Sequence, residues 1–254
     1  MRRARMTVAY RGDQFNGFAV NPGVQTVAST IEAALQQVMQ QEVKVIPAGR
    51  TDTGVHAWGQ VISLDLPERI ELDLLAKQLN ALCGPSIVVR EARWTQPDFH
   101  ARFSALWRSY RYNILNSPTP NPFMVETAWH ISRPLNMRAM QLASDALIGE
   151  HDFSAFCRKP RVTEGEERSM RRYVMAAKWT AFEGDVLQFE ITANAFCHQM
   201  VRSIVGTLSD IGIGKRPPSD MRGLILAGDR SEAAHLAPPQ GLTLWEVGYP
   251  VEPE

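Results

Sequence analysis

The segment AGRTDTGVHA, at residues 48–57, brings together residue types that can do chemistry. It contains Arg50, Asp52 and His56, and it lies between two predicted strands at residues 42–47 and 60–65. A guanidinium close to a carboxylate favours the charged form of that carboxylate. Glycine allows a tight backbone and the close approach of a partner. The segment is therefore interpreted as a loop that presents one anionic oxygen, from Asp52, to a substrate.

Two other interpretations of this loop need to be considered. Loops between strands are commonly rich in Gly, Thr and Asp for turn chemistry alone, so a purely structural turn remains open. A phosphate-binding P-loop is excluded, because Arg-Thr-Asp lies between Gly49 and Gly54 and no Gly-Lys-Ser/Thr follows.

The chain of 254 residues is long enough to bury a substantial core, as one large domain or two smaller halves. No apolar run approaches the roughly 20 residues that span a membrane. The basic start lacks the apolar stretch of a signal peptide. Cys83, Cys157 and Cys197 are odd in number and lack metal-type spacing. We therefore expect three thiols, a cytoplasmic location and no membrane partner.

Apolar periodicity predicts alternating helices and strands along the chain. Helices are expected at residues 26–40, 72–82, 137–148, 196–211 and 220–227. Strands are expected at residues 6–10, 87–94, 106–115, 127–131, 172–181, 186–193 and 242–247. This order predicts an α+β fold of two similar halves, each an antiparallel sheet with helices on one face. The halves are assigned to residues 1–105, which carry the loop, and 106–254.

Basic and aromatic residues gather between residues 90 and 112, although the net charge of the whole chain is zero. A neutral chain is by itself evidence against nucleic-acid binding. Guanidinium groups that meet phosphate and flat rings that stack on bases are nevertheless what an unpaired nucleic acid requires. The alternative is that the rings are core and the arginines are solvated. The residues concerned are Arg90, Arg93, Arg102, Arg108 and Arg111, with Trp94, Phe99, Phe103, Trp107, Tyr110 and Tyr112.

Two further features carry charge. Residues 158–172 mix Arg, Lys, Glu, Gly and Ser without periodicity, which predicts a mobile, basic loop. Arg202 lies in an otherwise apolar predicted helix. Because arginine is rarely buried without a partner, either an ion pair with Asp52 or a position on the polar side of the helix accounts for it.

Together these segments resemble the tRNA pseudouridine synthase A family. The matching motifs occur in family order and cover nearly the whole chain. The chain departs from the family pattern at Phe18-Ala19, where Trp-Gln is usual, at Gln199, where a second His is common, and at Ser203, where Asn is found. The matching segments are residues 49–57, 99–105, 110–112, 149–156, 194–196, 200–202, 204–208 and 237–242.

The resemblance implies the pseudouridine synthase fold, with an active cleft between two α+β halves, in a homodimer without metal or organic cofactor. It implies conversion of uridine to pseudouridine at positions 38, 39 and 40 of the tRNA anticodon arm. Asp52 matches the catalytic aspartate, and Arg50 matches the arginine two residues before it. Tyr110 matches the tyrosine that stacks on the target base, and Arg202 matches the basic partner of the aspartate. His56, in the same motif as Asp52, is expected to contact substrate.

The first chemical step remains open at this point. Asp52 is able to attack the ribose C1′, to stabilise an oxocarbenium-like centre, or to begin by deprotonating the sugar. A non-catalytic tRNA-binding module and an RNA-directed nucleosidase are the rival functions. The presence of both Asp52 and Arg202 favours catalysis.

Overall fold

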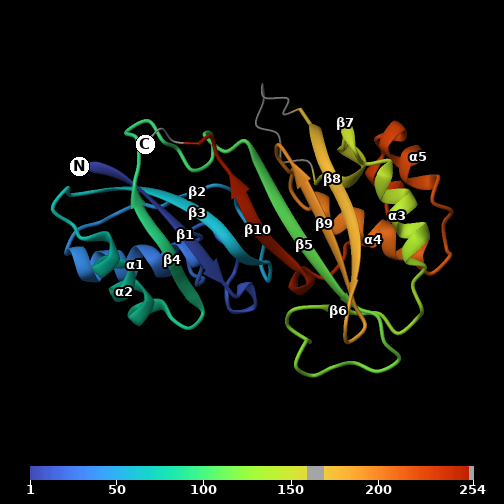
Figure 1. Ribbon diagram of the computed structural model, residues 1–254, viewed down its shortest axis with the longest axis horizontal. Coiled ribbons are helices and arrows are strands. Elements are labelled where there is room, and N and C mark those ends of the chain that lie inside the picture. The colour runs from blue at the N-terminus through green and yellow to red at the C-terminus, as the bar shows by residue number, and fades with distance from the viewer. Residues whose placement is uncertain (159–168, 252–254) are drawn as a thin grey trace. The chain divides into compact units, whose positions relative to one another are not determined.

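The computed structural model describes residues 1–158 and 169–251 (Figure 1). The chain divides into two compact units, Met1–Leu106 with Thr243–Glu254, and Trp107–Leu242. Each unit combines a sheet with helices, so the predicted α+β class is confirmed. The assignment of domains to residues 1–105 and 106–254 stays a prediction. Residues 159–168, the centre of the predicted mobile loop, lie outside the described residues.

The sheet of the first unit has the strand order β4–β1–β3–β10. β1 (Arg2–Tyr10) pairs in antiparallel fashion with β3 (His56–Leu66) and with β4 (Ile87–Trp94). β10 (Leu242–Gly248) joins β3 in parallel, and β2 (Ile46–Pro47) pairs with β3 in antiparallel fashion. The prediction of a wholly antiparallel sheet is therefore wrong at β10, because the chain returns to this sheet after building the second unit.

Two helices accompany this sheet. α1 (Val27–Met39) contacts α2 (Leu72–Cys83), and α2 contacts β4. Thr26 begins α1 with a capping box, in which Thr26 Oγ1 accepts from the Ser29 amide at 3.2 Å and Ser29 Oγ accepts from the Thr26 amide at 3.0 Å. A short 3-10 helix, η1 (Gly12–Gln14), follows β1.

The sheet of the second unit has the order β5–β9–β8–β7, and these strands are antiparallel. They are β5 (Trp107–Leu115), β9 (Val186–Ala193), β8 (Arg171–Phe182) and β7 (Gly149–Asp152). β6 (Trp129–His130) pairs in parallel with β5, so the prediction of an antiparallel sheet is wrong at this short strand as well. The helices of this unit are α3 (Met137–Asp145), α4 (Met200–Gly212) and α5 (Asp220–Ala227), with short 3-10 helices η2 (Ser154–Phe156), η3 (Arg230–Glu232) and η4 (Pro239–Gly241).

Two predicted boundaries next to the expected site are wrong. His56 and Ala57 open β3 instead of closing the preceding loop. The helix expected from residue 196 begins as α4 at Met200, because Gln199 has a left-handed backbone with φ of 67° that an α-helix cannot continue. Residues 194–199 are consequently an irregular segment in front of α4.

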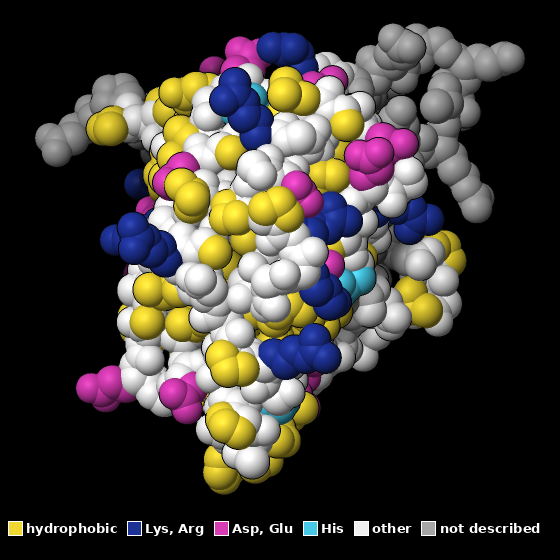
Figure 2. Space-filling model, turned by 90° about the vertical axis from the view of Figure 1, so that its right-hand side faces the viewer, with side chains coloured by type: hydrophobic (Ala, Val, Ile, Leu, Met, Phe, Trp, Pro, Cys, Tyr) yellow, Lys and Arg dark blue, Asp and Glu magenta, His cyan; other side chains and the backbone are white. Residues whose placement is uncertain are grey.

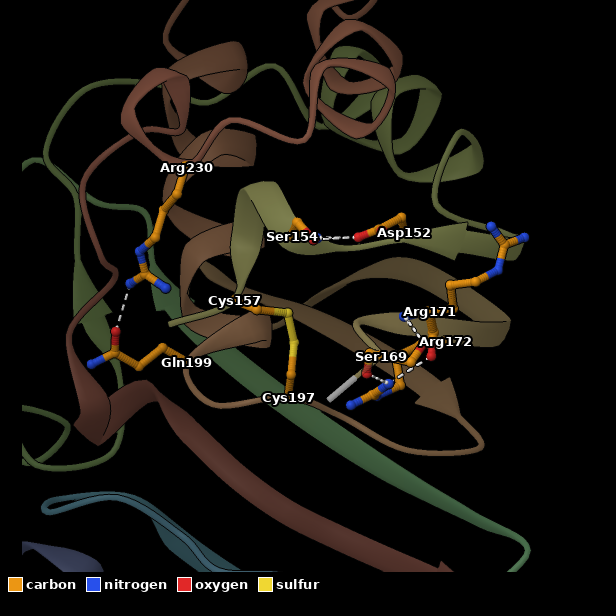
Figure 3. The surroundings of a disulfide bond; sticks show 9 residues. All are labelled: Asp152, Ser154, Cys157, Ser169, Arg171, Arg172, Cys197, Gln199 and Arg230. Atoms are coloured by element: carbon orange, nitrogen blue, oxygen red, sulfur yellow. Dashed lines mark hydrogen bonds between the residues drawn. A yellow bond between two sulfur atoms is a disulfide. The ribbon is translucent and has the colours of Figure 1, made fainter. Parts of the chain in front are cut away.

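The cysteines differ from the expectation of three thiols. Cys157 and Cys197 form a disulfide, with their Cα atoms 5.6 Å apart, whereas Cys83 is free and buried. The prediction is wrong for the pair because 40 residues separate the two in sequence, and only the tertiary fold brings them together. The disulfide joins the end of η2 to the irregular segment before α4 (Figure 3).

The described helices include none with the length and apolar character that crossing a membrane requires. On the face of the molecule on the α3 and α5 side, hydrophobic, basic and acidic side chains are interspersed (Figure 2). No single sign of charge dominates that face.

The core of the second unit depends on a close approach between α4 and a backbone segment. A Cβ atom at Gly206, in the middle of α4, would lie 1.8 Å from the carbonyl oxygen of His235. The Ala237 amide also donates to the carbonyl oxygen of Arg202 on α4 at 3.1 Å. The absence of a side chain at Gly206 therefore allows residues 235–237 to lie directly against the helix.

We predict that Gly206→Ala lowers the free energy of unfolding by about 1–3 kcal/mol, the usual cost of overpacking, although alanine is the better helix former. Chemical denaturation of the full chain measures this. Gly223→Ala in α5 is the matched control, because a Cβ there meets nothing within 4 Å; it should be neutral or stabilise by up to about 1 kcal/mol. Equal stability of the Gly206→Ala variant and the wild type would contradict the packing account.

Candidate active site

The loop that carries Asp52 is held by backbone hydrogen bonds on both sides of that residue. The Phe18 amide donates to the carbonyl oxygen of Thr51 at 3.1 Å, and the Val55 amide donates to that of Asp52 at 3.1 Å. At the start of the loop, the Ala48 amide donates to the carbonyl oxygen of Val61 in β3 at 2.8 Å. Asp52 therefore lies on a backbone whose neighbouring positions are fixed by β3 and by the segment around Phe18.

Buried side chains on β1 and β3 also form hydrogen bonds that hold this loop. The hydroxyls of Tyr10 and Thr51 are hydrogen-bonded at 2.8 Å. Gln60 Nε2 donates to the Gly49 carbonyl oxygen at 2.7 Å and to the Tyr10 hydroxyl at 3.3 Å. Burial raises the pKa of Tyr10 to about 12, so its hydroxyl stays protonated at neutral pH. These hydrogen bonds therefore hold Gly49 and Thr51, the two residues on either side of Arg50.

Gly17 lets a second chain segment pass close beneath the loop. Its φ is +85°, and a Cβ there would lie 3.0 Å from the Thr51 carbonyl oxygen. Thr51 itself is buried, whereas Asp52 is half-buried and Arg50 is exposed. The carboxylate next to the fixed Thr51 is thus partly accessible, as a catalytic or binding group must be.

His56 lies at the start of β3 and is only 6% exposed. Its Nδ1 accepts a hydrogen bond from the Gly12 amide at 3.0 Å. An imidazole that accepts at Nδ1 and is neutral carries its proton on Nε2. The described contact is with the protein's own backbone at η1, and the substrate contact expected for His56 stays a prediction.

Tyr110 is in β5 of the second unit and is 9% exposed. Its ring meets the edge of Phe196 in a T-shaped contact, with ring centroids 4.9 Å apart. Phe196 belongs to the irregular segment before α4. The position of the Tyr110 ring is therefore coupled to that segment through an aromatic contact.

Arg202 is half-buried near the start of α4. Its Nε donates to the Ala237 carbonyl oxygen at 2.7 Å, and the next carbonyl, that of Pro238, accepts from the Tyr112 hydroxyl at 2.8 Å. Burial raises the pKa of Tyr112, and the nearby charge of Arg202 opposes this rise. Arg202 and Tyr112 thus hold one proline-rich segment together. The predicted ion pair between Arg202 and Asp52 would join the two units and stays a prediction.

The basic and aromatic residues between 90 and 112 do not form one uniform surface. Phe99 is buried, as the core interpretation expected, and Tyr110 and Tyr112 are buried as well. Phe103 contradicts that interpretation, because it is 76% exposed, with the Arg102 guanidinium 5.4 Å from its ring centroid. Arg111 Nε is paired with Glu190 Oε2 at 2.6 Å. Of the residues in this group, Phe103 is the exposed ring, and Arg90, Arg93 and Arg102 are exposed guanidinium groups.

The sequence does not identify Tyr10 and Gln60 as supports of the candidate site. Alternation of apolar residues marks Tyr10 only as a core position in the first strand. The one available signal is a hydroxyl at the end of the first strand and an amide on the strand that follows the loop, and that pattern is common in sheets. Within residues 1–158 and 169–251, no group of three or more His, Cys, Asp or Glu is arranged to hold a metal ion.

Comparisons with known proteins match this chain over nearly its full length. A family model described as tRNA pseudouridine synthase matches residues 6–104 and 143–250. The tRNA pseudouridine synthase A of Brevibacillus brevis is 41% identical over 249 residues, which are 98% of this chain and 100% of that protein. The proteins of the same name from Bacillus subtilis and Frankia casuarinae are each 40% identical, covering 97% and 99% of this chain and 99% and 91% of theirs.

Among solved structures, a Cbf5–Nop10–Gar1 complex is similar at 13% identity and a TM-score of 0.37, covering 95% of this chain and 57% of that one. The family model and the relatives, in contrast, span the loop of Asp52 in the first unit and α4 in the second. They confirm the resemblance seen in the sequence and the enzyme class that it implied. The chain belongs to the tRNA pseudouridine synthase family, whose members are isomerases that act on tRNA.

Proposed function

We propose that this enzyme isomerises uridine to pseudouridine at positions 38, 39 and 40 of the tRNA anticodon arm, with the Asp52 carboxylate acting at the ribose C1′. One observation carries the assignment of Asp52. Its side chain is partly exposed on a loop whose adjoining residues are fixed by buried hydrogen bonds, from Phe18 to Thr51 and from Tyr10 to Thr51. A reacting group on a fixed backbone reaches its working position at little cost in free energy.

The reaction rearranges bonds without a net change in atoms. The C1′–N1 glycosidic bond breaks, the freed uracil turns, and a new bond forms between C1′ and C5. The proton on C5 must leave, and N1 gains one, so the product is an isomer of uridine. Carboxylates stabilise or attack the electron-poor C1′ centre in comparable reactions. Direct attack, stabilisation of an oxocarbenium-like centre and initial deprotonation of the sugar are all within the reach of an Asp52 carboxylate.

The other site residues have supporting roles in this proposal. Tyr110 stacks on the target base, and its contact with Phe196 sets the plane of the ring. Arg50, exposed two residues before Asp52, fills the place that the flipped nucleotide leaves in the stem. Arg202 is the basic partner of Asp52, and His56 contacts the substrate.

The substrate must leave the base stack before the reaction begins. Unstacking and unpairing one nucleotide costs a few kcal/mol, and contacts between protein and RNA must offset that cost. Enclosure of the site also keeps the detached uracil from escaping and water from capturing the sugar. The homodimer and the cytoplasmic location expected from the sequence stay predictions; light scattering on the purified protein measures the former.

We predict that Asp52→Asn abolishes pseudouridine formation and leaves tRNA affinity largely unchanged, because the amide keeps the size of the side chain and loses its charge. Chemical detection of pseudouridine in incubated tRNA, together with a binding titration, measures both properties. Turnover by the Asn variant would contradict the role of Asp52. Free uracil and abasic tRNA from the wild type would indicate a nucleosidase instead.

Tyr110→Phe keeps the ring and removes only the hydroxyl. If stacking is the whole role of Tyr110, kcat should fall by less than about tenfold, since base stacking depends on the ring face. Single-turnover rates with saturating enzyme measure the chemical step. A severe loss at unchanged tRNA affinity would show that the hydroxyl also takes part in proton transfer, for instance at C5.

We predict that Tyr10→Phe and Thr51→Val each lower kcat by about tenfold or more, because a small displacement of a reacting group has large effects on rate. KM for tRNA should stay nearly constant, since both side chains are buried beneath the loop. Thr51→Ser retains the hydroxyl and should keep most of the activity. Wild-type kcat in Tyr10→Phe, or an equal loss in Thr51→Ser, would show that the hydroxyl contact does not position Asp52.

A further inference from the structure

Arg230 is held beside α4 by a side-chain hydrogen bond. Its Nη2 donates to Gln199 Oε1 at 2.6 Å (Figure 3). Arg230 begins η3, and Gln199 is the left-handed residue immediately before α4. The η2 and η3 turns are in contact. This hydrogen bond uses Nη2 of Arg230 and fixes the direction of its guanidinium group, while the other nitrogens of that group do not take part in it.

A second arginine, Arg158, is held next to the same segment before α4. The Arg158 amide donates to the His198 carbonyl oxygen at 2.9 Å, one residue before Gln199. The Cys157–Cys197 disulfide joins the residue before Arg158 to the residue before His198, so the two segments are also connected covalently. Arg158 is close enough to Arg230 that its charge lowers the pKa of Arg230, in addition to the larger effect of burial. Two guanidinium groups therefore repel each other at this point.

No carboxylate among the described residues compensates this charge. Neither arginine forms a salt bridge with a described residue, and Arg230 Nη1 is buried without a hydrogen-bond acceptor. The carboxylate of Asp229, next in the chain, accepts from the amide and the hydroxyl of Ser231, both at 2.8 Å. Two nearby arginines have more partners: Arg171 Nε is paired with Glu150 at 2.9 Å, and Arg172 Nη1 donates to two backbone carbonyls, although Arg172 Nε is also buried without an acceptor.

Buried or clustered guanidinium groups are normally matched by anions. A planar guanidinium suits phosphate oxygens, which it binds with two donors at once. The irregular segment before α4 also links this place to the expected target base, because Phe196, three residues before Gln199, is in contact with the Tyr110 ring. An RNA strand at Tyr110 would therefore have near its neighbouring nucleotides two arginines that no described carboxylate pairs with.

We propose that Arg230 and Arg158 form a binding site for one backbone phosphodiester group of the tRNA, with Gln199 as the residue that positions Arg230. The proposal rests on the proposed function only in taking tRNA as the ligand. It does not depend on the role of Asp52. The site binds the RNA backbone and therefore adds affinity without reading sequence.

The test is the salt dependence of tRNA binding by the full chain, measured by titration of an unmodified tRNA transcript at a series of KCl concentrations. Each lost phosphate contact reduces the slope of log affinity against log salt by about 0.7–0.9. We expect Arg230→Gln and Arg158→Gln each to weaken binding by about tenfold at low salt and to flatten this slope by about one contact. Arg138→Gln, at an exposed position on α3, removes the same charge and should change neither.

An unchanged slope in both Arg230→Gln and Arg158→Gln would overturn the site, as would an equal change in Arg138→Gln, which would indicate a general charge effect. Arg158 is exposed, so its variant keeps the test valid if Arg230→Gln is poorly folded in a thermal unfolding control. If the role of Asp52 is wrong, the Asp52→Asn assay shows it, and the salt dependence of tRNA binding is unaffected. The two proposals can therefore fail independently of each other.

Discussion

The hydrogen bond between the buried hydroxyls of Tyr10 and Thr51 is the contact on which the candidate site depends most. It joins the end of β1 to the residue before Asp52, 41 positions later in the chain. Gln60 adds a second connection, from β3 to both the Tyr10 hydroxyl and the Gly49 carbonyl. A loop rich in glycine and threonine is mobile by composition. Here the three buried polar groups convert it into a fixed support, and the core packing of the first unit is what holds them in place.

In the second unit, side-chain hydrogen bonds also hold a chain segment in place, but the donors are a guanidinium and a hydroxyl and the acceptors are backbone carbonyls. Arg202 and Tyr112 donate to successive carbonyls of the Ala237-Pro238 segment, and Gly206 lets that segment lie against α4. These two side-chain donors satisfy the carbonyl oxygens of Ala237 and Pro238. The start of α4 is the most constrained part of this unit, since the disulfide and the contact between Gln199 and Arg230 converge there (Figure 3).

Much of this arrangement could be predicted from local sequence. The helix that begins after Thr26, the strand at residues 186–193 and the chemical character of residues 48–57 each follow from periodicity or composition over a few neighbours. The supports of the site could not, because Tyr10 and Gln60 lie on two different strands and Thr51 lies in the loop, so their contacts leave no periodic signal. The Cys157–Cys197 disulfide and the parallel pairing of β10 escape prediction for the same reason. The start predicted for α4, at residue 196, was wrong because of Gln199. Local propensity does not reveal the left-handed backbone conformation of that residue.

The central claim is that the contact between Tyr10 and Thr51 places the Asp52 carboxylate for reaction. A double-mutant cycle on single-turnover pseudouridine formation tests it most directly, with Tyr10→Phe, Thr51→Val and the double variant compared at saturating enzyme. Because each single change removes the same hydrogen bond, the double variant should react about as fast as the slower single variant. If the two losses multiply instead, the hydroxyls act independently, and the contact between them does not hold the catalytic loop.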